Sequence, residues 1–171
     1  DVVNAIKGAN EFGITKTQKL AGLLLFINDV HSLGLGVTQG MQLASAFYWD
    51  MNDETRKWSR RFFEKTKKMP NMLQAGAYSS TMHYLKAVKA TGTDDTDVVN
   101  KWIRSNPIND MFVKNGKIRE DGRMMREMYL FEVKKPSESK YPWDYFTLKA
   151  TIPAEQAFRP LSQSVCPLVK K

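Results

Sequence analysis

Residues 20–36 read LAGLLLFINDVHSLGLG, an apolar run over Leu20–Ile27 that changes abruptly to polar residues at Asn28. The run is apolar at consecutive positions rather than at alternate ones, which is typical of a strand covered on both faces in a parallel sheet. Apolar residues at helical spacing come before it, at Val2, Ile6 and Ala9. A helix followed by a strand buried on both faces predicts an α/β layer.

Three further helices are predicted downstream of this stretch. A basic amphipathic helix is expected over Thr55–Lys68, and strand character precedes it at Met41–Trp49. A second helix is expected over roughly Ser79–Ala90, and a third begins among acidic residues and ends at Pro107. Met72–Ala75 is expected to form a short strand.

From Ile108 onward, the signals of β-hairpins replace those of helices. NGK at residues 115–117 and EDGR at residues 120–123 are tight-turn signals. MYLFEV, Met128–Val133, is typical of a strand, and a polar loop containing proline is predicted over Lys134–Trp143.

Length and charge exclude some classes of protein. With 171 residues and 42% hydrophobic composition the chain is expected to be globular, and its longest apolar run is far shorter than a membrane span of ~20 residues. The net charge of +8 is densest in the helix over Thr55–Lys68. We interpret that face as an ordinary solvated one, with phosphate or anionic lipid as the alternative partner. No nucleic-acid binding is expected, because no element suited to reading a groove is recognisable.

Catalytic and metal chemistry find little support in the sequence. Asp29 and His31 make only two potential ligands where zinc takes three or four, and His83 is expected to be a partly buried structural residue. Residues 34–40, GLGVTQG, lack the spacing and the lysine of a phosphate-binding loop. Cys166 is the single cysteine. We therefore predict no metal, no cofactor and no enzymatic activity.

The polar edge of the opening stretch is better interpreted as the rim of a pocket. Open α/β sheets bind ligands at the carboxyl ends of their strands, and Asn28, Asp29 and His31 follow a predicted strand directly.

Two stretches together resemble the second half of a type I periplasmic solute-binding protein of the branched-chain amino acid kind. They are residues 20–95 and residues 115–138, the latter reading NGKIREDGRMMREMYLFEVKKPSE. The part most specific to this family is an aromatic helix, followed by six residues at characteristic spacing and then by the hairpin. The six residues are Pro70, Ala77, Tyr78, Ala87, Ala90 and Gly92.

The resemblance implies an α/β fold, a two-lobed three-layer αβα sandwich with three hinge crossings, of which only the C-terminal portion is present. Residues 1–40 would end the second lobe and residues 41–53 would form a hinge crossing. Residues 54–107 would return to the first lobe. Residues 108–171 would return to the second lobe with the β-hairpins and a C-terminal tail.

The resemblance also implies the function of an ABC importer's solute-binding component, located in the periplasm or attached to the cell surface, with any signal peptide removed. The solute would be a small amino acid, such as a branched-chain one, or an aromatic or aliphatic carboxylate. The protein partners would be the membrane permease subunits and the missing N-terminal half of the same protein. A ligand-sensing domain of a receptor or regulator with the same fold is the alternative.

Six ligand-binding residues follow from the resemblance, three on each wall of the cleft. Asn28, Asp29 and His31 match the second-lobe loop that faces the solute, and Gln74, Gly76 and Tyr78 match the first-lobe turn opposite. A tyrosine offers both a flat apolar wall and a hydroxyl. Tyr78 can equally be a packing residue, and Asp29 a turn or cap residue.

Overall fold

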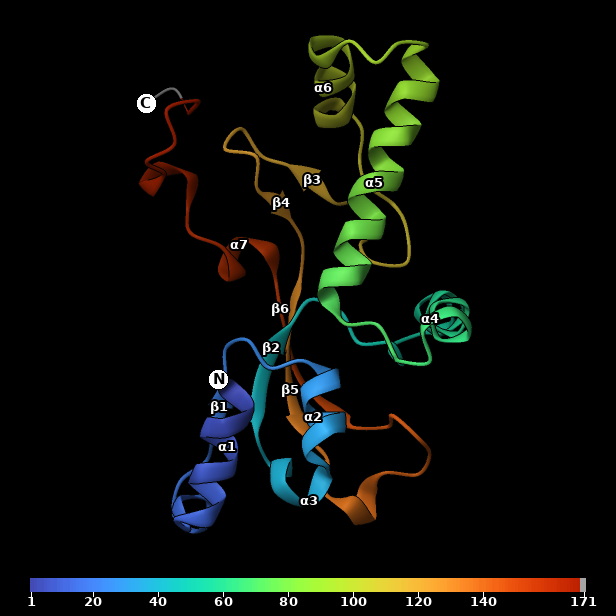
Figure 1. Cartoon of the computed structure of the whole chain (residues 1–171). Coiled ribbons are helices and arrows are strands. Elements are labelled where there is room, and N and C mark those ends of the chain that lie inside the picture. The colour runs from blue at the N-terminus through green and yellow to red at the C-terminus, as the bar shows by residue number, and fades with distance from the viewer. Residues whose placement is uncertain (170–171) are drawn as a thin grey trace. The chain divides into compact units, whose positions relative to one another are not determined.

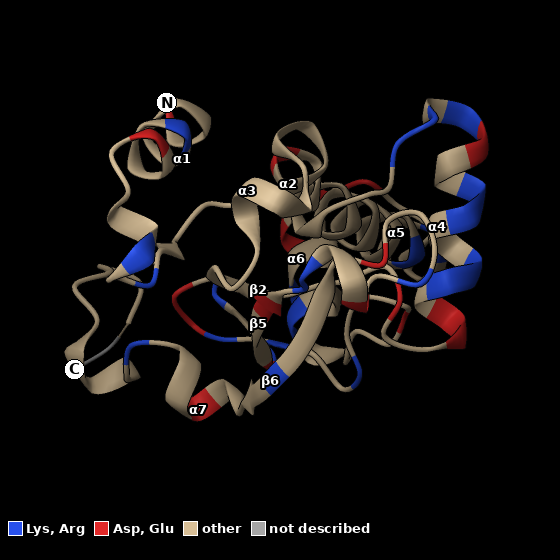
Figure 2. Cartoon of the chain, turned by 90° about the horizontal axis from the view of Figure 1, so that it is seen from below, with Lys and Arg blue, Asp and Glu red and all other residues tan. Residues whose placement is uncertain are grey.

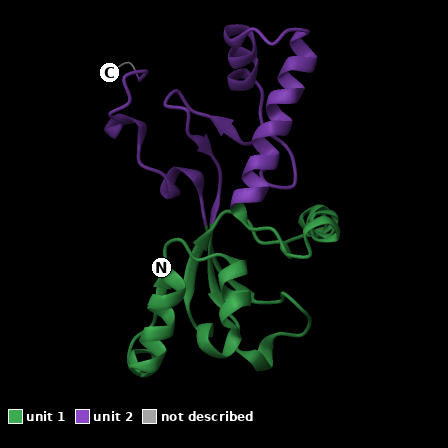
Figure 3. Ribbon diagram, viewed as in Figure 1, with its two compact units in different colours: residues 1–72, 129–151 green, residues 73–128, 152–171 purple. Residues whose placement is uncertain are grey.

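The computed structural model describes residues 1–169, which divide into two compact units (Figure 3). Unit 1 comprises residues 1–72 and 129–151, and unit 2 comprises residues 73–128 and the chain from Ile152 onward. These boundaries differ from the predicted ones after residues 40, 53 and 107. The assignment of segments to two lobes stays a prediction.

Unit 1 contains a mixed four-stranded sheet in the order β1-β2-β5-β6 (Figure 1). The strands are β1 (Ala21–Gly22), β2 (Gln42–Ser45), β5 (Met128–Val133) and β6 (Phe146–Ile152). β1 and β2 run parallel, and β2 and β5 run antiparallel with Leu43 opposite Phe131. The predicted strand over Met128–Val133 is confirmed to the residue, whereas β6 has no counterpart in the sequence-based prediction.

Four helices belong to unit 1: α1 (Val2–Glu11), α2 (Ile27–Leu33), α3 (Leu35–Thr38) and α4 (Asp53–Thr66). α4 is the predicted basic helix, and Figure 2 shows Lys and Arg along its length. Its N-terminus is fixed by a reciprocal pair, in which Thr55 N–H donates to Asn52 Oδ1 and Asn52 N–H donates to Thr55 Oγ1, both at 3.0 Å. Short 3₁₀ turns cover Ile14–Lys16 and Pro136–Glu138.

The prediction of a long strand over Leu20–Ile27 is wrong. β1 ends at Gly22, and Leu23 and Leu24 form a turn in which their side chains are 88% and 67% exposed. A Cβ added at Gly22 would lie 2.6 Å from Leu25 Cβ, so the chain folds back closely over this glycine. Because of that turn, Leu25 enters the core with 2% exposure, and α2 begins two residues later.

Unit 2 is built from two helices and a hairpin, α5 (Met72–Thr91), α6 (Thr96–Ser105), β3 (Lys117–Ile118) and β4 (Met124–Met125). α7 (Ala154–Ala157) and a 3₁₀ turn over Leu161–Gln163 follow β6. The predicted start of α6 is confirmed, because Asp95 Oδ1 accepts from the N–H groups of Asp97 and Val98. The hairpin has its tight turn at residues 120–123, as predicted.

Met72–Ala75 is the first turn of α5 and not the predicted short strand. The buried positions of α5 recur every four residues, at Ala75, Ser79, His83 and Ala87. This spacing places them on one helical face, and the small side chains among them allow close packing there.

Within residues 1–169, no helix combines the length and the apolar character needed to cross a membrane.

Candidate functional site

The carboxyl ends of β1 and β2 meet at one edge of the unit 1 sheet, because the two strands are parallel. The chain leaves this edge through Phe26, the N-cap of α2, and through the turn that follows Ser45. Ser45 Oγ donates to the carbonyl of Phe47 at 2.8 Å and accepts from its N–H at 3.2 Å, which fixes that turn. A void of about 10 Å³ remains among Phe26, Ser45, Phe47, Asn71 and their neighbours. This void is too small to hold a solute.

Asn28 joins α2 to the segment that precedes α5. Its Nδ2 donates to the carbonyl of Met69 at 3.0 Å, and its Oδ1 accepts from Asn71 Nδ2 at 3.1 Å. Both ends of the amide are thus used within unit 1. Asn71 was not among the predicted site residues, and its position just after Pro70 gives no sequence signal of such a contact.

Asp29 caps the helix on which it lies. Its Oδ2 accepts from the N–H of Phe26 at 2.8 Å, three residues earlier in the chain. A carboxylate in the first turn also interacts favourably with the positive end of the helix dipole. The structure therefore gives Asp29 the turn or cap role that the sequence left open, and it leaves the second carboxylate oxygen outside this bond.

His31 lies against two aromatic residues of the segment before β6. Its ring stacks on the Trp143 indole with centroids 3.8 Å apart and planes 10° from parallel. Its Nδ1 and the Tyr145 hydroxyl are 2.7 Å apart. Burial raises the pKa of Tyr145, so its hydroxyl keeps its proton. The ring is otherwise exposed, with Nε2 outside this contact.

The residues that hold Trp143 in place were missed by the sequence analysis. The Trp143 carbonyl accepts from the Tyr48 hydroxyl at 3.2 Å and from Trp49 Nε1 at 2.9 Å, and its backbone is left-handed with φ +69°. Such a backbone is unfavourable for a tryptophan, so these two bonds stabilise it. Burial raises the pKa of Tyr48, which keeps the donating hydroxyl protonated. The aromatic residues of PWDYF, at 142–146, were the available signal.

In unit 2, the three predicted residues lie in the first two turns of α5. Gln74 is exposed, while Gly76 and Tyr78 are half-buried. A Cβ at Gly76 would lie 3.6 Å from two ring carbons of Phe112, so the glycine lets this ring approach the helix. The Arg126 guanidinium carbon is 4.0 Å from the centroid of the same ring, a cation–π contact.

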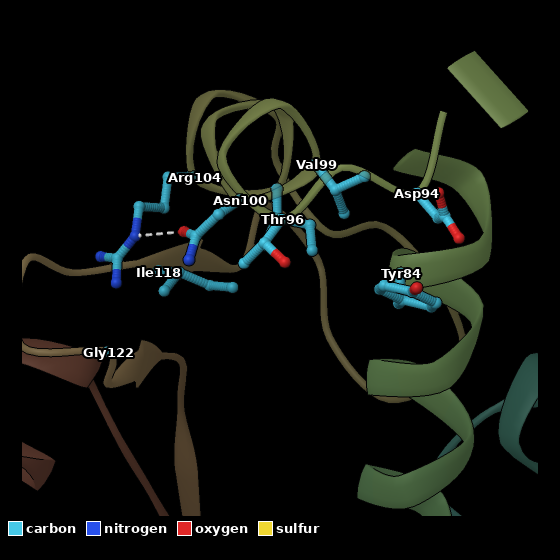
Figure 4. A pocket seen from close by; sticks show the side chains of 9 residues that line it. Tyr84, Asp94, Thr96, Val99, Asn100, Arg104, Ile118 and Gly122 are labelled. Atoms are coloured by element: carbon cyan, nitrogen blue, oxygen red, sulfur yellow. Dashed lines mark hydrogen bonds between the residues drawn. The ribbon is translucent and has the colours of Figure 1, made fainter. Parts of the chain in front are cut away.

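An apolar cavity of unit 2 lies elsewhere, among α5, α6 and the hairpin (Figure 4). It encloses about 370 Å³, and Tyr84, Val99, Ile103 and Ile118 supply its apolar walls. Arg104 Nε donates to Asn100 Oδ1 at 2.8 Å at its edge. None of the six predicted site residues lines it.

The structure groups the six predicted residues by unit. Asn28, Asp29 and His31 share α2 in unit 1, and Gln74, Gly76 and Tyr78 share α5 in unit 2. Their assignment as a solute site stays a prediction. In the part of the chain from residue 1 to 169, no group of three or more His, Cys, Asp and Glu residues is placed to hold a metal ion.

Comparison with known proteins gives consistent matches. The family model described as "Periplasmic binding protein" matches residues 1–140. A periplasmic binding protein from Burkholderia mallei is 56% identical, with a TM-score of 0.94 over 99% of this chain and 45% of its own. A branched chain amino acid ABC transporter periplasmic ligand-binding protein from Burkholderia xenovorans is 45% identical, with a TM-score of 0.87 over 97% of this chain and 45% of its own.

A more distant structure shows the fold alone. The amino acid ABC transporter substrate-binding protein from Pseudomonas fluorescens is 18% identical, with a TM-score of 0.80 over 96% of this chain and 44% of its own. The chain thus spans less than half the length of each of these solved relatives. Among curated proteins, none matches it.

Proposed function

Because the chain belongs to the periplasmic binding protein family, we propose that it is part of the non-enzymatic solute-binding component of an ABC importer. The observation that carries this proposal is the pair of relatives at 56% and 45% identity over nearly the whole chain. One of the two is named as an ABC transporter ligand-binding protein for branched-chain amino acids. Such a component works in the periplasm, captures a small solute and delivers it to membrane permease subunits.

The complete site requires residues outside this chain. The chain spans 45% of each of these two relatives. Within unit 1, the strand edge encloses only about 10 Å³, whereas small-molecule sites are clefts of about 300–1,000 Å³. We therefore assign the solute to a cleft between two lobes, completed by an N-terminal half.

The solute class that we propose is a small carboxylate, either an amino acid or an acid with an apolar or aromatic body. Tyr78, Gln74 and His31 can donate hydrogen bonds to a carboxylate. An amino acid also needs an acceptor for its ammonium group, because an unpaired buried charge is costly. Asp29 is the nearest such acceptor, but its Oδ2 already accepts from Phe26 N–H. The other oxygen of Asp29 lies outside that bond, so both kinds of carboxylate remain in the proposal.

The proposal is tested by calorimetric titration of the full two-lobed protein and of the 171-residue chain with leucine and with an aromatic acid. We expect the two-lobed protein to bind one of these solutes and the chain alone to bind it at least ten-fold more weakly, because one wall supplies only part of the contacts. Equal affinities would contradict the shared site. Absence of binding across a panel of amino acids and carboxylates would contradict the function.

The site residues are tested in the two-lobed protein with a matched pair of variants on α5. Tyr78→Phe removes a hydroxyl from the proposed wall and is expected to weaken binding about ten-fold, equivalent to about 1.4 kcal/mol. Tyr84→Phe removes one from a residue that is 44% exposed and lies outside the proposed wall. We expect it to leave binding unchanged, and equal effects would reject Tyr78 as a ligand.

A further inference from the structure

The positive charge of the chain is concentrated on α4 and the residues directly after it. Residues 53–68 carry seven Lys or Arg and three Asp or Glu, a net charge of +4 and half of the chain's +8. Neither the proposed solute site nor the cavity of unit 2 uses these residues. The basic face of α4 therefore remains without a function.

Four of these cations lie on one face of the helix. The basic face comprises Lys57, Arg60, Arg61 and Lys65, whose spacing of three, one and four residues places them on a single side of α4. All four side chains are exposed, and among residues 1–169 none of them forms an ion pair. Glu64 is the carboxylate between Lys57 and Lys65, and Asp53 and Glu54 of the first turn lie on the same side of the helix. Figure 2 shows the blue segments gathered along this helix.

Arg56 differs from these four, because its charge is already neutralised. Its Nε is 2.5 Å from Asp50 Oδ1, and its Nη1 is 2.7 Å from Asp53 Oδ1. Arg56 thus belongs to the structure of unit 1, while the basic face is left for a partner.

The opposite side of α4 anchors it firmly in unit 1. Trp58 is 8% exposed and meets the Phe47 ring edge to face at 5.7 Å between centroids. Ser59 and Thr55 are also buried there, and Lys67 ends the helix in a left-handed conformation with φ 58°. The helix that carries the four cations is therefore fixed in unit 1, so docking does not have to order its backbone.

We propose that the basic face of α4 docks onto a carboxylate-rich protein surface, which, resting on the proposed function, is the periplasmic face of the importer's membrane subunits. Two neighbouring arginines suit this partner, because each guanidinium can pair with a carboxylate, as it can with a phosphate, through two parallel hydrogen bonds. A lipid surface is the weaker fit. Helices that bind membranes insert Trp, Phe or Leu, and the large apolar residues of α4 are turned inward, with Phe62 and Phe63 half-buried.

The test uses the full two-lobed protein and the importer's membrane subunits in phosphatidylcholine nanodiscs. The variant Arg60→Gln, Arg61→Gln and Lys65→Gln removes three charges and keeps good helix formers. Its matched control, Lys86→Gln, Lys89→Gln and Lys101→Gln, removes three exposed charges from α5 and α6. We expect the α4 variant to bind the subunits at least ten-fold more weakly, mainly through a slower association rate, and the control to stay within two-fold.

A variant that is expected to bind faster distinguishes loss of the docking surface from misfolding of the α4 variant. Glu64→Gln removes the carboxylate from the basic face, and we expect association about two-fold faster at low salt, with the difference disappearing at about 0.5 M NaCl. Equal losses in the α4 variant and its control, or no gain from Glu64→Gln, would overturn the proposal. Binding to empty phosphatidylglycerol nanodiscs equal to that with the subunits would assign the face to lipid instead.

Solute titration separates failure of this inference from failure of the proposed function. We expect the α4 variant to keep the wild-type affinity for the solute, because none of its substitutions touches the proposed solute walls. If wild type binds both the solute and the subunits, and the α4 variant binds the subunits equally well, only the docking proposal is overturned. Wild-type protein that binds neither overturns both.

Discussion

Unit 1 and unit 2 differ in the size of the apolar core that each buries. In unit 1, Phe131 and Val133 of β5 are each 1% exposed, and Val30 of α2 is completely buried. In unit 2, the buried stripe of α5 consists of small or polar residues, while Tyr84 and Leu85 on the same helix are 44% and 50% exposed. Unit 1 buries many large side chains, whereas unit 2 buries fewer, among them Ile108 and Phe112.

The difference shows where the stability of the chain resides. Burial of large apolar side chains dominates folding free energy, and a small core contributes little of it. We therefore expect substitutions of equal severity to cost more in unit 1 than in unit 2. The apolar surface of α5 is consistent with a chain that spans less than half of its relatives, because further residues can cover it.

The largest expected effect comes from the centre of the unit 1 core. Phe131→Ala empties a position where the ring lies 5.6 Å from the rings of both Tyr48 and Phe146, and we expect a loss of about 3–5 kcal/mol in unfolding free energy. The matched pair is Val133→Ala in unit 1 and Val99→Ala in unit 2, at positions 1% and 3% exposed, and we expect the first to cost more. Urea titrations of both variants provide the comparison, and equal losses would contradict the difference between the units.

The ion pair of Lys134 and Asp144 gives the next largest effect. Asp144 is 2% exposed, and its other oxygen accepts from Lys140 N–H at 3.0 Å. Asp144→Asn leaves the mostly buried ammonium without its counter-charge, so we expect a cost of about 2–4 kcal/mol. Asp53→Asn, which removes a fully exposed carboxylate from Arg56, should change stability by less than about 0.5 kcal/mol. Urea titration measures both losses. An Asp144→Asn variant as stable as wild type would show that the pair contributes nothing to stability.

The helices and the tight turns could be predicted from the sequence because their signals are local. The apolar spacing of α1, the acidic start of α6 and the turn at residues 120–123 are all confirmed. The strand over Leu20–Ile27 could not be judged locally. Consecutive leucines are equally compatible with a buried strand and with a turn whose outer side chains are exposed, and the close approach of Leu25 to Gly22 decides between them.

The candidate site was less predictable than the fold, because its contacts join residues far apart in the chain. Asp29 as a cap follows a local rule, since its partner Phe26 is three residues away. The partners of His31 lie 112 and 114 residues away, at Trp143 and Tyr145, and no periodic pattern links them. Sequence reasoning therefore identified the local role open to Asp29 but not the distant side chains that His31 contacts.

A third comparison concerns the charged pair inside unit 2. A hydrogen bond from Arg119 lowers the pKa of Asp121 from 3.8 to about 2. A carboxylate with a lowered pKa stabilises the folded state above its unfolded pKa, and this contribution is lost as the pH falls toward the folded one. We expect Asp121→Asn to be less stable than wild type at pH 7, with the gap closing between about pH 4 and pH 2. Hydrogen exchange at the Arg123 amide, which donates to Asp121, reports the change locally.

A difference in stability between wild type and Asp121→Asn that stayed constant from pH 7 to pH 2 would show that the charge of Asp121 does not contribute to stability.

The smallest effect is expected on the exposed side of α5, and it tests the comparison most directly. Leu85→Gln replaces a side chain that is 50% exposed with a good helix former, so the 171-residue chain should change by less than about 0.5 kcal/mol. If an N-terminal half covers α5, the same substitution in the two-lobed protein buries an amide and should cost about 1–3 kcal/mol. Thermal unfolding of both proteins measures the two values. Equal small values would mean that Leu85 is exposed to solvent in the two-lobed protein as well.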